Sequence, residues 1–184
     1  MTTIIQWLLA ATLAWVPILT PVKTMTSSRD LRAEIVRDVF EVTQDPNEQP
    51  LFQGDNAREK TALFLLAIAS FESGFHPLVD SGRIKGDGGN SWCHMQILIG
   101  EGRTTEGWTG KDLIADRKKC FRAGLHILHT AKALCPYLKP ADRFSAYAVG
   151  RCTSGLRAVR SRYERSSSWL KQTPIPSVQG APTR

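Results

Sequence analysis

The chain has 184 residues, of which 42% are hydrophobic and 22% are charged, and its formal net charge is +7. This length suits one domain with a buried core plus short extensions, and the ordinary hydrophobic and charged fractions exclude a wholly disordered chain. The positive charge favours an anionic partner or surface, and nucleic acid, acidic lipid and cell-wall polymer all fit that description.

The first 25 residues contain the most hydrophobic stretch of the chain, from Ile4 to Val22. Its length approaches that of a bilayer span, which favours a signal peptide or a membrane anchor. Against a standard signal peptide, no Lys or Arg precedes the stretch, Lys23 follows it, and Pro17 interrupts its second half. Two alternatives therefore stay open for residues 1–25: an exported or anchored segment, or a helix packed on the domain.

The pattern after this segment predicts two helices separated by a loop. Hydrophobic residues recur every four positions over 29–42, which is typical of a helix. Residues 44–54 contain two prolines and several turn-forming residues, which indicate a loop. Asn56, followed three residues later by Glu59, resembles a capping box that opens the second helix.

The second helix is expected to end in a carboxylate. The stretch 63-LFLLAIASFESGFHPL-78 is apolar up to Glu72, and Gly74 and Pro77 stop the helix behind it. A helix C-terminus disfavours a negative charge, and burial against neighbouring aromatic side chains disfavours it too. Both effects favour a carboxyl that keeps its proton, which is what a general acid needs. The alternative is a carboxylate that points into solvent.

The remaining pattern combines an irregular segment with more helices. Residues 80–108 are rich in glycine, which predicts turns and allows a short hairpin. Helices are expected over 112–134, with a division near Asp116, over 141–149 and over 155–170. Thr153 or Ser154 is expected to cap the last helix. Residues 171–184 contain three prolines and little to bury, so we expect a flexible tail.

The four cysteines, Cys93, Cys120, Cys135 and Cys152, permit two disulfides in three connectivities. Cys120 and Cys135 lie fifteen residues apart on one expected helix. That spacing puts them over about 20 Å apart, well beyond the roughly 7 Å that a disulfide spans. Of the two connectivities left, Cys93–Cys120 with Cys135–Cys152 needs the shorter connections and is preferred. Four free thiols in a reducing compartment are the alternative.

Metal binding is not expected. No cysteine pair has the C-x-x-C spacing of a zinc ribbon, and the four histidines share no ligand spacing on a common face. Two tryptophans, Trp92 and Trp108, either stack on sugar rings or cover the core. Four arginines of the last expected helix are interpreted as a solvated face that can dock on anionic polymers: Arg157, Arg160, Arg162 and Arg165.

Three segments carry a family resemblance by their order and spacing: 72-ESGFHP-77, 86-GDGGNSWCHMQI-97 and 145-SAYAVGRC-152. They resemble the motifs of the lytic transglycosylase and goose-type lysozyme superfamily, over roughly residues 58–165. The matching positions are Glu72, Ser73 and Pro77 in the first motif, Met95, Gln96 and Ile97 in the second, and Ala146, Tyr147 and Gly150 in the third. Cys93 and His94 stand where the family has Gly-Leu, and Ala148-Val149 replace its Asn-Ala.

The resemblance implies a mainly α, lysozyme-like domain over 26–170, with a glycine-rich loop or small β-hairpin beside the cleft. It implies cleavage of the β-1,4 bond between N-acetylmuramic acid and N-acetylglucosamine in peptidoglycan, without metal or other cofactor. Glu72 would act first as acid and then as base, forming a 1,6-anhydro end. Substrate contacts would come from Gln96, Tyr147, Ser73 and Met95.

A second chemistry within the same resemblance is hydrolysis with inversion. It needs another carboxylate that activates water, roughly 6.5–9.5 Å from the acid. Asp87 is the best candidate for that role, followed by Asp80. Asp87 also reads as an ordinary turn residue, because it stands in an Asp-Gly-Gly sequence.

The implied partner is the glycan strand of peptidoglycan rather than a specific nucleic acid. The implied location is the periplasm, the cell envelope or the exterior, or a virion if the gene is viral. The N-terminal segment would then allow association with a membrane or an envelope complex. A different class of function stays open, namely a non-catalytic basic module that binds wall polymer or nucleic acid and has no need of Glu72.

Overall fold

The structure is a computed structural model that describes residues 3–16 and 22–176. The helices are α1 (Thr3–Trp15), α2 (Val22–Gln44), α3 (Ala57–Glu72), α4 (Pro77–Asp80), α5 (Gly110–Ala115), α6 (Arg117–Leu134), α7 (Ala146–Val149) and α8 (Leu156–Gln172). Two 3-10 turns, η1 (Asp87–Gly89) and η2 (Pro140–Phe144), and two strands, β1 (Ser91–Trp92) and β2 (Ile97–Leu98), complete the described elements. The expected mainly α domain with a small hairpin is confirmed, and the architecture is consistent with a lysozyme-like fold.

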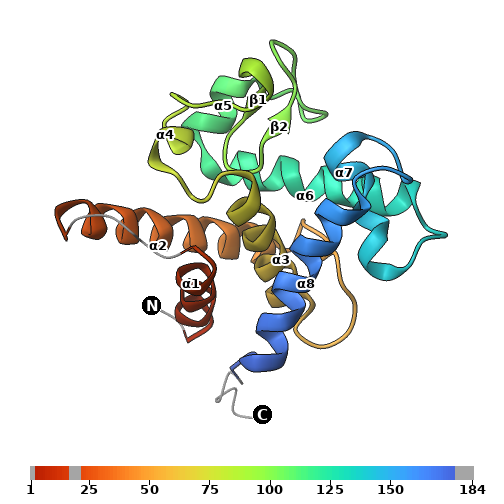
Figure 1. Cartoon of the computed structure of the whole chain (residues 1–184), viewed down its shortest axis with the longest axis horizontal. Helices are drawn as coiled ribbons and strands as arrows, with labels where there is room; N and C mark the ends of the chain where they lie inside the picture. Colours follow the sequence, from red (N-terminus) through yellow and green to blue (C-terminus); the bar gives the residue numbers. More distant parts are fainter. Residues whose placement is uncertain (1–2, 17–21, 177–184) are drawn as a thin grey trace.

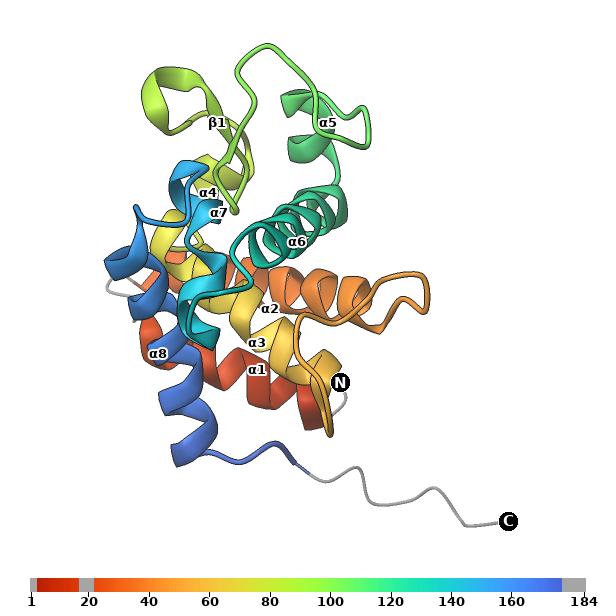
Figure 2. The ribbon, with the colours of Figure 1, turned by 90° about the vertical axis from the view of Figure 1, so that its right-hand side faces the viewer.

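Helix α3 forms the centre of the molecule. Its residues 61–70 are all buried, because α1, α2 and α8 pack around it. Figures 1 and 2 show these helices surrounding α3. A helix that is apolar on every side is stable only in such a position. Its last residue is Glu72, as predicted.

Helix α1 packs into this core. Trp7 is 5% exposed and Leu8 is fully buried. The indole Nε1 of Trp7 donates a hydrogen bond to the Thr173 carbonyl oxygen over 3.0 Å, which joins α1 to the residue after α8. No helix within residues 3–16 and 22–176 combines the length and hydrophobicity needed to cross a bilayer.

The hairpin, α4 and α5 lie together at the end of α3 that carries Glu72 (Figure 1). Strand β1 pairs antiparallel with β2, with Trp92 opposite Ile97. Helix α5 ends at Ala115 and α6 begins at Arg117, so the division near Asp116 is confirmed. The glycine-rich segment therefore forms one compact group of short elements beside the end of the central helix.

Both preferred disulfides are present. Cys93–Cys120 joins the hairpin turn to α6, with a Cα–Cα distance of 6.1 Å. Cys135–Cys152 joins the end of α6 to the segment after α7, with a Cα–Cα distance of 5.6 Å. The described chain has no free cysteine. The pairing predicted from the sequence is confirmed.

Both predicted helix caps are wrong. Asn56 has φ 54°, and its side chain makes no capping hydrogen bond, because this left-handed backbone turns the side chain away from the first turn of α3. The N-cap residue of α8 is Gly155, which has φ 74° and no side chain that could cap the helix. Neither Thr153 nor Ser154 is therefore the cap. Several helix bounds also differ, and the helix expected over 141–149 is divided into the 3-10 turn η2 and the short helix α7.

Helix α2 begins at Val22, seven residues before the expected start at 29, and α8 ends at Gln172, two residues after the expected end at 170. Residues 177–184 of the expected tail lie outside the described residues.

Candidate active site

Glu72, the last residue of α3, contacts α8, which is far from it in the sequence. Its side chain is 19% exposed, and it forms an ion pair with Arg162 of α8, whose side chain is 12% exposed. The guanidinium of Arg162 is therefore the charge partner of this carboxylate. The sequence analysis did not anticipate this partner.

Tyr147 of α7, which belongs to the third sequence motif, also interacts with Glu72. Its hydroxyl donates a hydrogen bond to the Met95 carbonyl oxygen over 2.5 Å. Burial and then the charge of Glu72 raise the pKa of Tyr147 well above its usual value, although Arg162 acts in the opposite direction. Tyr147 is therefore a neutral phenol near the Glu72 carboxylate, and it ties α7 to the hairpin turn.

Gln96 closes that hairpin turn in a left-handed conformation, with φ 48°. Its side-chain Nε2 donates to the Cys93 carbonyl oxygen over 2.9 Å. Its Oε1 lies so close to Gly86 that a Cβ at position 86 would be only 2.1 Å away. The orientation of the amide therefore depends on glycine at this position.

Cys93 also has a left-handed backbone, with φ 58°. A residue with a side chain adopts this conformation only at a steric cost, which glycine avoids. In this chain the disulfide to Cys120 holds the residue in place.

Met95, predicted to contact the substrate, has its side chain in the core. The side chain is fully buried, and a Cβ on Gly124 of α6 would lie 2.6 Å from its Cε atom. Its apolar chain therefore fills the core below the hairpin. Trp92 is also buried, with its ring against Gly110 and Lys85 over it, so it covers the core.

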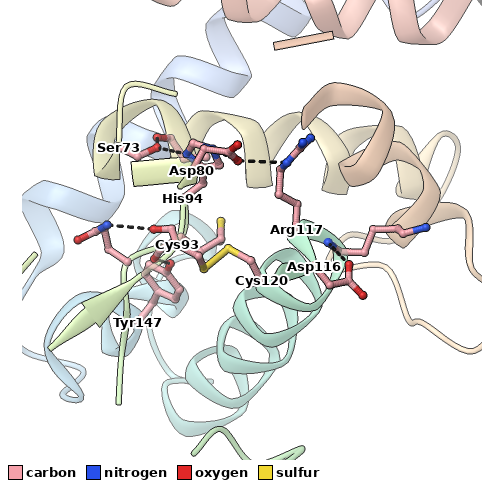
Figure 3. Close-up of a disulfide and its surroundings, with 12 residues drawn as sticks. Ser73, Asp80, Cys93, His94, Asp116, Arg117, Cys120 and Tyr147 are labelled. Atoms are coloured by element: carbon pink, nitrogen blue, oxygen red, sulfur yellow. Dashed lines mark hydrogen bonds and ion pairs between the residues drawn. A yellow bond between two sulfur atoms is a disulfide. The ribbon is translucent and has the colours of Figure 1, made fainter. Parts of the chain in front are cut away.

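Ser73 begins a chain of polar contacts that continues through His94 and Asp80 to Arg117 (Figure 3). Its Oγ lies 2.9 Å from Nδ1 of His94, and Nε2 of His94 lies 3.1 Å from Oδ1 of Asp80. Arg117 Nε lies 3.1 Å from the same Asp80 oxygen. His94 is 1% exposed. The sequence analysis noted His94 only as a departure from the family motif, and that departure was the signal for this cluster.

Both candidates for a second carboxylate are engaged in local structure. Burial raises the pKa of Asp80, but the hydrogen bond with His94 and the charges of His94 and Arg117 outweigh it, so the pKa lies below its usual value. Asp87 is exposed, starts the turn η1, and accepts a hydrogen bond from the Ser91 hydroxyl. Asp80 therefore joins α4 to the hairpin turn and to α6, whereas Asp87 has a structural role within its own turn.

The interpretation of the α8 arginines as a solvated face is wrong for two of the four, Arg162 and Arg165. Arg165 donates to the Ser70 hydroxyl over 2.7 Å and lies 3.7 Å from the Phe71 ring centroid. Because α8 packs along α3, these two side chains contact α3. Arg157 and Arg160 are exposed, and Arg160 also forms a two-pronged pair with Asp142 of η2, over 2.6 and 2.8 Å.

Near Glu72, a cavity of about 510 Å³ is lined by Phe71, Arg165 and residues of α1 and α8. Glu72, Gln96 and Tyr147 are not among the residues that line it. This hollow is therefore separate from the motif residues.

No protein-family model matches the chain, and no curated protein or solved structure matches it either.

Proposed function

We propose that this protein cleaves peptidoglycan strands at the β-1,4 bond between N-acetylmuramic acid and N-acetylglucosamine, as a lytic transglycosylase. One observation supports this most: the Tyr147 hydroxyl donates to the Met95 carbonyl oxygen, in the turn that carries Gln96, and burial and then the charge of Glu72 raise the pKa of this phenol. Residues of all three sequence motifs thus belong to one connected group at the end of α3.

In the proposed reaction, Glu72 donates its proton to the glycosidic oxygen as the bond to C1 breaks. The resulting carboxylate then accepts the proton of the sugar's 6-hydroxyl, whose oxygen attacks C1 and closes the 1,6-anhydro ring. Arg162 stabilises the carboxylate between the two steps. Gln96 offers amide groups that suit the donors and acceptors of a sugar, and Tyr147 holds the turn.

The single-carboxylate route is favoured over hydrolysis by the state of the other acids. Asp80 is held by His94 and Arg117, and Asp87 by Ser91. A base that activates water needs a carboxylate free to accept a proton. We therefore expect anhydro ends rather than ordinary reducing ends.

The proposed place of action is an oxidising compartment such as the cell envelope or the exterior. Disulfides persist in such compartments and are rare in a reducing cytosol. The two disulfides support this location, which also contains the proposed substrate.

The test is digestion of purified peptidoglycan sacculi with the full chain, followed by mass analysis of the muramic acid ends. Glu72→Gln should abolish cleavage without unfolding the protein, whereas Glu59→Gln in the first turn of the same helix should leave cleavage intact. Ordinary reducing ends throughout would replace the transglycosylase with a hydrolase. Salt-dependent DNA binding without any cleavage would favour the non-catalytic basic module.

A further inference from the structure

Two adjoining hollows lie where the loop of residues 45–56 meets α6, η2, α8 and the start of α3. The first has a volume of about 240 Å³ and the second about 320 Å³. Phe52, Gln53 and Tyr163 line both of them, so the two hollows share a wall. We call the pair the loop groove.

The loop groove is lined by three cations and by no acid. Lys132 and Arg143 line the first hollow, and Lys60 lines the second. Among the ion pairs of the described residues, none involves any of these three. The hollow beside α2 is different, because its cations Lys118 and Arg122 pair with acids of the protein. Of these two places, the loop groove is the one whose positive charge is available to an anionic ligand.

The polar side chains of the groove also have free hydrogen-bonding capacity. Neither the Gln53 amide nor the Tyr163 hydroxyl bonds to another residue of the described ranges 3–16 and 22–176. Lys132 and Arg143 each donate one hydrogen bond to a backbone carbonyl oxygen, over 2.6 and 3.0 Å, and keep further N–H groups. An amide and a phenol both donate and accept, so they suit the N–H and C=O groups of a peptide backbone.

The floor of the groove is apolar and fixed in shape. Phe52 meets Phe64 and Phe144 edge to face, with ring centroids 5.7 and 6.1 Å away, and both of these partners are buried. The floor therefore does not offer the open ring faces on which sugars or bases stack. Each hollow is also small beside the roughly 300–1,000 Å³ of a typical small-molecule site, so each suits a single side chain.

We propose that the loop groove binds an extended acidic peptide of a partner protein. Alternate side chains of an extended chain lie on one side, about 7 Å apart, so one peptide can fill two hollows that share a wall. Its carboxylates would pair with Lys60 in one hollow and with Lys132 and Arg143 in the other. Its backbone would bind Gln53 and Tyr163.

This peptide site is separate from the proposed glycan cleavage and goes beyond it. Lys60 precedes Glu72 by twelve residues on α3, which places it about 18 Å away along the helix axis. A partner held in the loop groove would therefore tether the protein while leaving the end of α3 free.

The test is fluorescence anisotropy of a labelled pentapeptide with the full chain. The probe is Glu-Leu-Glu-Leu-Glu, and its control has Gln in place of each Glu and carries the same dye. We expect the acidic peptide to bind at least about tenfold more tightly than the control, because only its carboxylates can pair with the cations. Absence of binding, or equal binding of both peptides, would overturn the proposal.

Single charge changes locate the peptide on the protein. Lys60→Gln and Arg143→Gln, one in each hollow, should each weaken binding about fivefold, the size of one partly exposed ion pair. Lys111→Gln removes the same charge from an exposed position of α5 and should leave binding unchanged. Equal losses in all three variants would show attraction to the net positive charge alone and would overturn the proposal.

A variant that keeps every charge tests the shape of the groove. Ser167 lines the second hollow, so Ser167→Phe should fill it and abolish peptide binding while thermal unfolding stays cooperative. Full binding in this variant would overturn the proposal, and if the variant does not fold, the charge changes above still decide it. Tighter binding of single-stranded DNA, or of vesicles with phosphatidylglycerol, than of the acidic peptide would also overturn it.

The two proposed activities can fail separately. Lys60→Gln and Arg143→Gln should cleave peptidoglycan as the wild type does, because neither residue belongs to the motif group at Glu72. If the wild type cleaves no peptidoglycan, the proposed function fails, and the anisotropy measurements still decide the peptide site.

Discussion

Arg162 and Glu72 form an ion pair that joins α8 to the end of α3, and both side chains are largely shielded from water. Within the described part of the chain, Nε of Arg162 is buried without a hydrogen-bond partner. An unsatisfied buried donor is unfavourable, so the arginine is held here by its contact with Glu72 and by packing. The guanidinium also lies over the Phe71 ring, 5.6 Å from its centroid. Arg162 therefore holds the proposed acid in place through an ion pair and packs against the aromatic ring beside it.

Arg162→Met tests this ion pair. Glu72, whose side chain is only 19% exposed, would lose the cation that pairs with it. Thermal unfolding should therefore occur at a lower temperature, and cleavage of peptidoglycan should fall. Arg157→Met, at an exposed position of the same helix, should change neither. Unchanged unfolding and cleavage in Arg162→Met would show that the ion pair does not hold Glu72 in place.

Gly86→Ala tests the orientation of Gln96. Gly86 has φ −81° and ψ 176°, so alanine fits the backbone, but its Cβ would collide with the Gln96 amide oxygen. The amide is the end of a flexible side chain, so it should move while the fold persists. We expect cleavage to fall about as far as in Gln96→Ala, with thermal unfolding changed little. Equal activity of Gly86→Ala and wild type would count against a substrate contact by this amide.

Leu8→Ala tests whether α1 belongs to the folded domain. Leu8 is fully buried in the core. Truncating a leucine in such a position costs about 2–5 kcal/mol of unfolding free energy. Urea unfolding of the full chain should reveal this loss, whereas Gln6→Ala, at an exposed position of the same helix, should show almost none. Identical unfolding curves for Leu8→Ala and wild type would mean that α1 is not packed in solution.

His126 predicts a pH dependence of stability. Its Nδ1 contacts Glu106 and its Nε2 lies 2.8 Å from Glu48, so two loops are tied to α6 through one ring. Burial alone lowers the pKa of His126, but the hydrogen bonds and charges of Glu106 and Glu48 outweigh it and raise the pKa above its usual value.

A histidine whose pKa is raised by folding stabilises the protein when it is charged. Its contribution is complete below the unfolded value of about 6.5, and it is lost as the pH rises through the higher folded value. The difference in unfolding free energy between wild type and His126→Asn should therefore shrink with rising pH. The control is His129→Asn, since His129 contacts only the Gln49 carbonyl oxygen among the contacts described. A difference that is constant from pH 5 to about pH 9 would contradict the assignment.

Several features of the fold could be predicted from local sequence. The apolar run before Glu72 predicted the central helix, and the spacing of the cysteines on one helix excluded the Cys120–Cys135 pair. These predictions succeeded because helix periodicity, helix-stopping residues and chain geometry act over a few neighbouring residues. The predicted caps at Asn56 and Ser154 failed because a left-handed backbone at Asn56 and at Gly155 decided the entry into each helix.

The amino-acid sequence by itself determined the helical class, the position of Glu72 at a helix end and the choice of disulfides. Only the tertiary structure decided which side chains meet: Arg162 pairs with Glu72, and His94 contacts Ser73 and Asp80. It also decided that Met95 packs into the core. The physical reason is that hydrophobic periodicity is a property of neighbouring residues. Ion pairs and hydrogen bonds, in contrast, depend on distances of a few ångströms between segments that are brought together only when the whole chain folds.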